Sequence, residues 1–135
     1  MIAIGRILVL DDSAMMRMVL RKSLSMAKVQ ANEIVDATDG QEALRLLQSG
    51  LPFDLMFCDL NMPGMTGDEL IAELMKTTGL AIPPIVIVSA EATPERIERL
   101  QSDRIIGVLR KPFSPEMIAK LVSESKVIGT KEIAV

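Results

Sequence analysis

The chain of 135 residues contains no histidine, tryptophan or tyrosine, and it has only three phenylalanines and one cysteine. The absence of histidine excludes Ser-His catalytic triads, histidine zinc sites and imidazole acid–base chemistry, because each of these needs that ring. Few aromatic rings and a net charge of −3 argue against nucleic acid as a direct partner. The remaining chemistry must use carboxylate, hydroxyl, amine or thiol groups.

Long apolar runs are also missing from the sequence. No stretch approaches the roughly 20 apolar residues of a membrane-spanning helix, so we expect no membrane insertion. The single Cys58 cannot form a disulfide within the chain, as a reducing compartment would permit. The first residues lack the pattern of a cleaved leader. We therefore expect a cytoplasmic protein.

Four short apolar runs each lead into reactive side chains. The runs at 6–10, 55–58, 85–88 and 108–109 precede, in that order, Asp11 with Asp12, Asp59, Ser89 and Lys111. Such runs are typical of buried strands in a parallel sheet, and ligands of open parallel sheets bind beyond the carboxyl ends of the strands. The sequence therefore predicts three carboxylates, one hydroxyl and one ammonium in a single crevice.

Segments with helical spacing of apolar residues separate the predicted strands. A further strand is predicted at 33–37, and Ser13, Thr93 and Ser114 are each placed to cap a helix. The alternation of strand and helix, five times over with short connections, predicts one doubly wound α/β domain with helices on both faces of the sheet.

The helix after Ser13 carries most of the methionines near the amino end. Its inner side is predicted to consist of Met16, Val19, Leu20 and Leu24. The chain has ten methionines, of which Met15, Met16, Met18 and Met26 lie near this helix. We expect most of them to fill gaps in the core, since this side chain is flexible and apolar; an adaptable partner-binding surface is the alternative.

The three predicted carboxylates repel one another when they share a site. Two unit charges about 4 Å apart interact by roughly 4 kcal/mol at an effective dielectric of about 20. Either one acid binds a proton or a cation settles among them, and an all-oxygen cluster with few protein ligands suits Mg²⁺. A carboxylate beside such a metal can attack phosphorus, while Lys111 and Ser89 contact the phosphoryl oxygens.

These residues resemble the receiver domains of bacterial two-component response regulators, in particular the single-domain, CheY-like type. The matching motifs are Leu8–Ser13, Asp54–Gly67, Val88–Ala90 and Lys111–Phe113. The resemblance implies a flavodoxin-like, five-stranded parallel sheet in the order 2-1-3-4-5. We expect the receiver domain to span residues 1–127 and leave the tail at 128–135 unassigned.

The resemblance also implies a role for each residue. Asp59 becomes the phosphoacceptor. The metal ligands are Asp11, Asp12, Asp59 and the backbone carbonyl of Asn61. Ser89 and Lys111 contact the phosphoryl group, and its lifetime is modulated by Asn61, Ala90 and Glu91. The Lys111–Pro112 bond is expected to be cis. The phosphodonor is expected to be a histidine kinase or a phosphotransfer protein, and the output a change in binding to an unknown partner protein. The chain is expected to catalyse only its own phosphorylation and dephosphorylation.

One departure and two alternatives stand beside this interpretation. Val108 occupies a position where many family members place Tyr or Phe, so the aromatic relay of those proteins is not expected here. A degenerate receiver that acts as an unphosphorylated scaffold is one alternative. A magnesium-dependent phosphatase of the haloacid dehalogenase type is the other, although such enzymes normally carry a second acid where this chain has Asn61.

Overall fold

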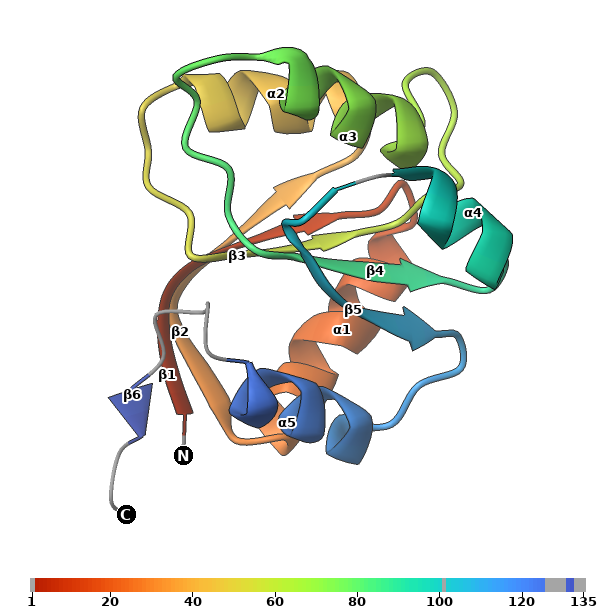
Figure 1. Ribbon diagram of the computed structural model, residues 1–135. Coiled ribbons are helices and arrows are strands. Elements are labelled where there is room, and N and C mark those ends of the chain that lie inside the picture. The colour runs from red at the N-terminus through yellow and green to blue at the C-terminus, as the bar shows by residue number, and fades with distance from the viewer. Residues whose placement is uncertain (1, 101, 126–130, 133–135) are drawn as a thin grey trace.

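The computed structural model describes residues 2–100, 102–125 and 131–132. Strands and helices alternate along this range (Figure 1). The strands are β1 (Ile2–Leu10), β2 (Val29–Ala37), β3 (Leu55–Cys58), β4 (Ile85–Ser89), β5 (Ile105–Arg110) and β6 (Lys131–Glu132). The helices are α1 (Ala14–Met26), α2 (Gly40–Gln48), α3 (Gly67–Lys76), α4 (Pro94–Leu100) and α5 (Pro115–Glu124).

The strands form one sheet in the order β2-β1-β3-β4-β5, and all four neighbouring pairs are parallel. The predicted order is therefore confirmed. Strands β1 and β2 begin earlier than predicted, because their ladder extends back to the pair of Ile2 with Val29. The unassigned tail contributes β6, which pairs antiparallel with the start of β1. The predicted domain boundary at residue 127 lies outside the described residues.

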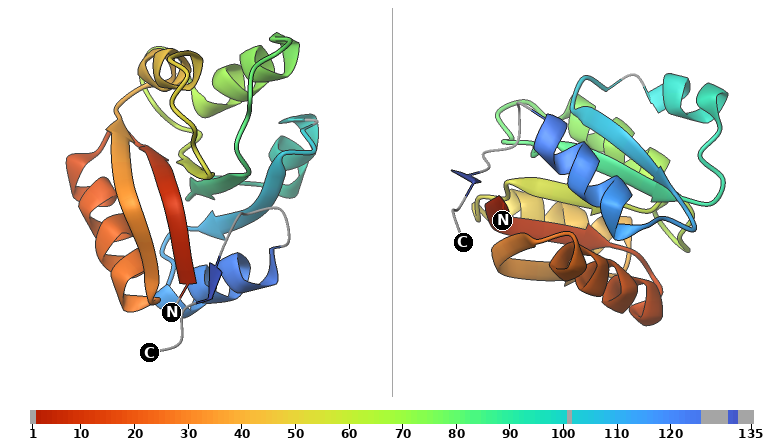
Figure 2. Two further views of the ribbon diagram at one scale, coloured as in Figure 1. Left: turned by 90° about the vertical axis from the view of Figure 1, so that its left-hand side faces the viewer. Right: turned by 90° about the horizontal axis from the view of Figure 1, so that it is seen from below.

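Helices cover both faces of the sheet, as predicted. Helices α1 and α5 lie side by side on one face, and α2, α3 and α4 lie on the other (Figures 1 and 2). The central strands β3 and β4 are apolar except for Ser89, and every residue of both is buried. None of the described helices is both long enough and apolar enough to cross a membrane.

Side-chain caps fix where the helices begin. The hydroxyl oxygens of Ser13, Thr93 and Ser114 each accept a bond from the backbone N–H three residues later, as predicted. Asp39 and Thr66 cap α2 and α3 in the same way. The first four backbone N–H groups of a helix have no partner within the helix, and each cap supplies an acceptor for one of them. The caps therefore fix the residue at which each helix begins, at the carboxyl edge of the sheet.

The inner side of α1 differs from the prediction. Leu20 and Leu24 are buried and Met16 is partly buried, but Val19 is 41% exposed. Val19 is displaced from Leu20 by roughly 100° around the helix, so it lies beyond the stripe that the sheet and α5 cover. The expectation that most methionines of this region fill the core is wrong for three of them, Met15, Met18 and Met26, which are 72%, 67% and 64% exposed.

Candidate functional site

Three carboxylates meet at the carboxyl ends of β1 and β3. Asp11 and Asp12 follow β1 and Asp59 follows β3, and the register places the last residues of these two strands beside each other. One oxygen atom of each acid lies within 4.8 Å of the others. Asp11 and Asp59 are buried, whereas Asp12 is exposed. The structure thus gathers the three acids into one cluster, of which Asp12 is the exposed member.

Lys111 reaches this cluster from the end of β5. Its Nζ lies 3.2 Å from Asp11 Oδ2 and 3.8 Å from Asp59 Oδ2. The backbone N–H of Lys111 donates to the carbonyl of Ser89, and the Lys111–Pro112 bond is cis, as the resemblance implied. One ammonium therefore faces three carboxylates, and the cluster keeps an excess of negative charge.

Ser89 lies at the end of β4 on the same edge of the sheet. Its side chain is fully buried, and its Oγ accepts a hydrogen bond from the backbone N–H of Glu91 at 3.1 Å. Because Oγ acts as the acceptor in that bond, the hydroxyl hydrogen can still be donated to another atom. The residue thus offers a donor at the carboxyl edge of the sheet.

The predicted modulating residues form the rim of the site. Asn61 donates its backbone N–H to Asp59 Oδ1 at 3.3 Å and its side-chain amide to Glu91 Oε2 at 3.2 Å. Ala90 is exposed and lies between Ser89 and Glu91 in the chain. The role of the Asn61 carbonyl as a metal ligand stays a prediction.

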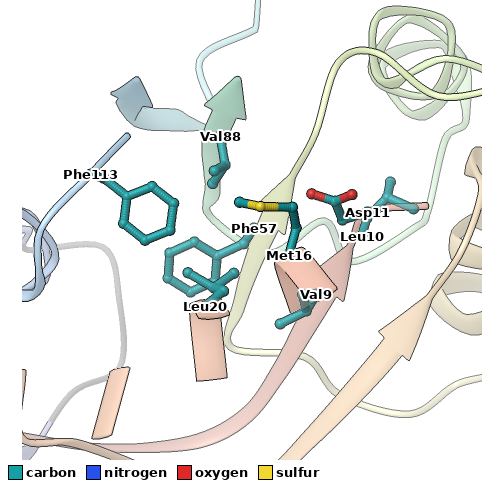
Figure 3. Close-up of a pocket in the computed structure, with 8 residues that line it drawn as sticks. All are labelled: Val9, Leu10, Asp11, Met16, Leu20, Phe57, Val88 and Phe113. Atoms are coloured by element: carbon teal, nitrogen blue, oxygen red, sulfur yellow. The ribbon is translucent and has the colours of Figure 1, made fainter. Parts of the chain in front are cut away.

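An apolar wall lies beside the acidic cluster. Figure 3 shows the Asp11 carboxylate at the edge of this wall, with Met16 next to it. The wall consists of Val9, Leu10, Met16, Leu20, Phe57, Val88 and Phe113. The cavity among these side chains has a volume of about 10 Å³, which holds at most one water molecule. The cavity therefore has no room for a ligand larger than a water molecule.

Burial is the main cause that raises the pKa of Asp59 above its ordinary value. The positive charge of Lys111 and, to a smaller extent, the hydrogen bond from the Asn61 N–H lower this pKa. The negative charges of Asp11 and, to a smaller extent, Asp12 raise it further. The ionised carboxylate is therefore less stable here than in water, and a proton or a cation is favoured beside it. The neighbouring Cys58 thiol has its pKa raised by burial as well, which fits a packing role.

The predictions from the sequence did not include Arg96, a charged residue that lies near the site. Arg96 of α4 donates Nε and Nη2 to the two carboxylate oxygens of Asp68 at 3.0 and 2.6 Å. Its Nη1 also donates to Asn61 Oδ1 at 2.8 Å. The hydrogen bond to Asp68 is the main cause that raises the pKa of Arg96.

The available signal for Arg96 was its position in the chain. A cation in the first turn of a helix is unfavourable for the helix dipole, which indicates an acidic partner elsewhere. The sequence does not identify that partner, because Asp68 precedes Arg96 by 28 residues.

Comparison with known proteins defines the class. Residues 7–123 match the family model described as the response regulator receiver domain, and the chain belongs to this family. The chain is 31% identical over 119 residues to the chemotaxis protein CheY of Pseudomonas aeruginosa, with 88% of this chain and 94% of that protein covered. It is 35% identical over 119 residues to the two-component response regulator ORR6 of Oryza sativa subsp. japonica, with 87% and 68% covered.

Solved structures agree with this assignment. The structure of the chemotaxis protein CheY4 of Vibrio cholerae has a TM-score of 0.71 at 30% identity, and it covers 89% of this chain and 97% of that one. The chain is therefore a CheY-like receiver domain of a two-component system, a signalling switch activated by phosphorylation. Proteins of this type act in signalling and are not conventional enzymes. The unphosphorylated scaffold and the haloacid-dehalogenase-type phosphatase are not favoured by these matches.

Proposed function

We propose that Asp59 accepts the phosphoryl group in the presence of Mg²⁺. The observation that carries this proposal is the convergence of three carboxylate oxygens within 4.8 Å. Carboxylates with an adjacent backbone carbonyl suit Mg²⁺, which keeps several waters and binds few protein ligands. Asp11, Asp12, Asp59 and the carbonyl of Asn61 would hold the ion, and when bound it supplies positive charge to the acids and to an arriving phosphoryl group.

Of the two buried acids, the hydrogen bonds favour Asp59 over Asp11 as the nucleophile. Both oxygens of Asp11 have donors, since Oδ1 accepts from the N–H of Ser13 at 2.9 Å and Oδ2 accepts from Lys111 at 3.2 Å. Asp59 accepts only a longer bond at Oδ1, and its Oδ2 lies 3.8 Å from the Lys111 ammonium, beyond hydrogen-bond distance. A lone pair on Asp59 Oδ2 is therefore more available for attack on phosphorus than a lone pair on either oxygen of Asp11.

The reaction transfers one phosphoryl group between two side chains. Asp59 Oδ2 attacks the phosphorus of a phosphohistidine, the phosphorus–nitrogen bond breaks, and the released imidazole nitrogen takes up a proton. Lys111 Nζ and the Ser89 hydroxyl donate to the phosphoryl oxygens. Dephosphorylation is a separate hydrolysis: water attacks the phosphorus, the bond between phosphorus and Asp59 Oδ2 breaks, and inorganic phosphate leaves as the carboxylate is restored. The chain then catalyses only its own phosphorylation and dephosphorylation, and Asn61, Ala90 and Glu91 control how water approaches.

The proposed donor is a histidine kinase or a phosphotransfer protein, because the chain itself contains no histidine. The proposed output is a change in affinity for another protein in the cytoplasm. We take residues 1–127 as the receiver unit and 128–135 as a tail, which is supported by a family match that ends at residue 123.

A small phosphodonor tests the phosphoacceptor directly. Incubation of the protein with acetyl phosphate and Mg²⁺ should add one phosphoryl group, measured by intact mass, and removal of Mg²⁺ with a chelator should prevent the addition. Hydroxylamine should release the group, because it cleaves acyl phosphates and leaves phosphate esters of serine intact.

Two variants complete this test. Asp59→Asn should remove the modification, whereas the control Asp103→Asn, which removes the same charge from an exposed site, should keep it. Unchanged modification of Asp59→Asn would overturn the assignment.

A further inference from the structure

One arginine side chain joins three segments that meet beside the acidic cluster. Arg96, in the first turn of α4, binds both carboxylate oxygens of Asp68 at the start of α3. The same guanidinium donates to Asn61 Oδ1 at 2.8 Å and to the Leu60 carbonyl at 3.4 Å, both in the loop after β3. Because the guanidinium donors lie in one rigid plane, Arg96 holds its acceptors in a fixed arrangement.

These bonds also fix the orientation of the Asn61 amide. Its Oδ1 accepts from Arg96, and its Nδ2 donates to Glu91 Oε2 at 3.2 Å. Arginine can only donate and an ionised carboxylate can only accept, so the opposite amide orientation would lose both bonds. The Asn61 side chain is thus held between α4 and the loop before it.

The backbone of Asn61 connects this network to the acidic cluster. Its N–H donates to Asp59 Oδ1 at 3.3 Å, so a single residue contacts the proposed phosphoacceptor through its backbone and Arg96 through its side chain. Val108 on β5 has neither a polar atom nor a ring, and it cannot make an equivalent link. Two hydrogen bonds, from the Asn61 N–H to Asp59 and from Arg96 to the Asn61 side chain, therefore connect the site to α4.

We propose that Arg96 is a positioning residue that couples the orientation of α4 to the occupancy of the acidic site, through the Asn61 amide. This inference rests on the proposed role of Asp59. A phosphoryl group on Asp59 alters the bond that the Asn61 N–H makes, and its oxygens attract the nearby guanidinium away from its present acceptors. The position of α4 then follows the state of Asp59. Because such coupling is reciprocal, a partner that holds α4 also changes how well the site retains the group.

Beryllium fluoride with Mg²⁺ provides a stable mimic of the phosphoryl group for the test, and amide NMR shifts provide the readout. In the wild-type protein we expect shifts at Asp59, Ser89 and Lys111 and also along residues 95–100 of α4. In Arg96→Gln the shifts at the site should persist, whereas those of α4 should fall to less than a third of their wild-type size.

Further variants test the route through the amide. Asn61→Ala should reduce the α4 response as much as Arg96→Gln does, and the double variant should show no additional loss, since both changes break one path. The control Arg99→Gln removes the same charge from an exposed position of α4 and should keep the full response. Persistent shifts at the site show that Arg96→Gln and Arg99→Gln are folded, and an unchanged circular dichroism spectrum shows the same for Asn61→Ala and the double variant.

The outcomes separate this inference from the proposed function. An undiminished α4 response in Arg96→Gln, or an equal loss in Arg99→Gln, would overturn the coupling alone. Site shifts in the wild-type protein without any response of α4 would do the same. The absence of shifts at Asp59 and Lys111 would overturn the proposed phosphoacceptor, and the coupling with it.

Discussion

Replacement of Asp59 by asparagine should stabilise the metal-free protein at neutral pH. The variant keeps the size of the side chain and an oxygen that accepts from the Asn61 N–H, but it removes one negative charge. The new amide nitrogen can donate to the neighbouring carboxylates. Lys111 keeps its partner Asp11 at 3.2 Å, so no ammonium is left unpaired. The perturbation therefore changes the charge of the cluster and little else.

The distances from Asp59 to its charged neighbours determine the size of the expected gain in stability. At an effective dielectric of about 20, a carboxylate within 4.8 Å repels Asp59 by at least about 3.5 kcal/mol, and Lys111 at 3.8 Å attracts it by about 4.4 kcal/mol. Two acids against one ammonium leave a net repulsion, and burial adds to it. Because Asp12 is exposed and water screens it, we expect a gain of about 1–2 kcal/mol, or roughly 4–8 °C in Tm.

The effect should depend on pH with a definite sign. Because the pKa of Asp59 is raised above the ordinary 3.8, the folded chain binds more protons than the unfolded chain in a window that begins near 3.8 and extends upward. The stability of the wild-type protein therefore falls as pH rises through this window, and the full penalty is present above it. Asparagine does not ionise, so the advantage of the variant should be complete at neutral pH and absent below pH 3.8.

Urea denaturation in the presence of a chelator, repeated from acid to neutral pH, measures this difference. The control Asp103→Asn removes an exposed charge and should change stability little. A variant at Asp59 that is less stable than wild type at neutral pH, or a gain that is independent of pH, would refute the electrostatic reasoning.

Three further predictions concern the metal, a glycine and a helix cap. Mg²⁺ at about 100 times its Kd should stabilise the wild-type protein by about 2.7 kcal/mol, and Asp12→Asn should weaken this rise in Tm, since Asp12 is exposed and its carboxylate faces the cluster; an equal rise in the variant would exclude Asp12 as a ligand. Gly67→Ala should cost about 1–3 kcal/mol and shift the amide signals of Asp59, because the added Cβ would meet the Asp59 carbonyl and lie 2.9 Å from the Leu60 Cα; an unchanged urea midpoint would contradict this. Thr66→Ala should cost about 1 kcal/mol in urea denaturation, because it removes the capping box of α3, and Thr66→Ser should retain most of that stability.

The sequence determined the strands and the acids because both follow from local patterns. A run such as Leu55–Cys58 is too apolar to be anything but buried, and the acid that follows it must emerge at the edge where parallel strands end. Asp11, Asp12 and Asp59 could therefore be placed together from sequence alone. The order of the strands came from resemblance to a family, since spacing does not say which strands pair.

Only the tertiary structure decided contacts between segments that are distant along the chain. Lys111 and Asp11 are 100 residues apart, and the packing of β5 beside β4 sets their separation of 3.2 Å. The bonds of Arg96 to Asp68 and Asn61 depend in the same way on how α4 lies against α3 and the loop after β3. Met18 on α1 is exposed because neither the sheet nor α5 covers its side of that helix. Helical spacing predicts that one apolar stripe is buried, but the width of the stripe depends on which elements pack against the helix.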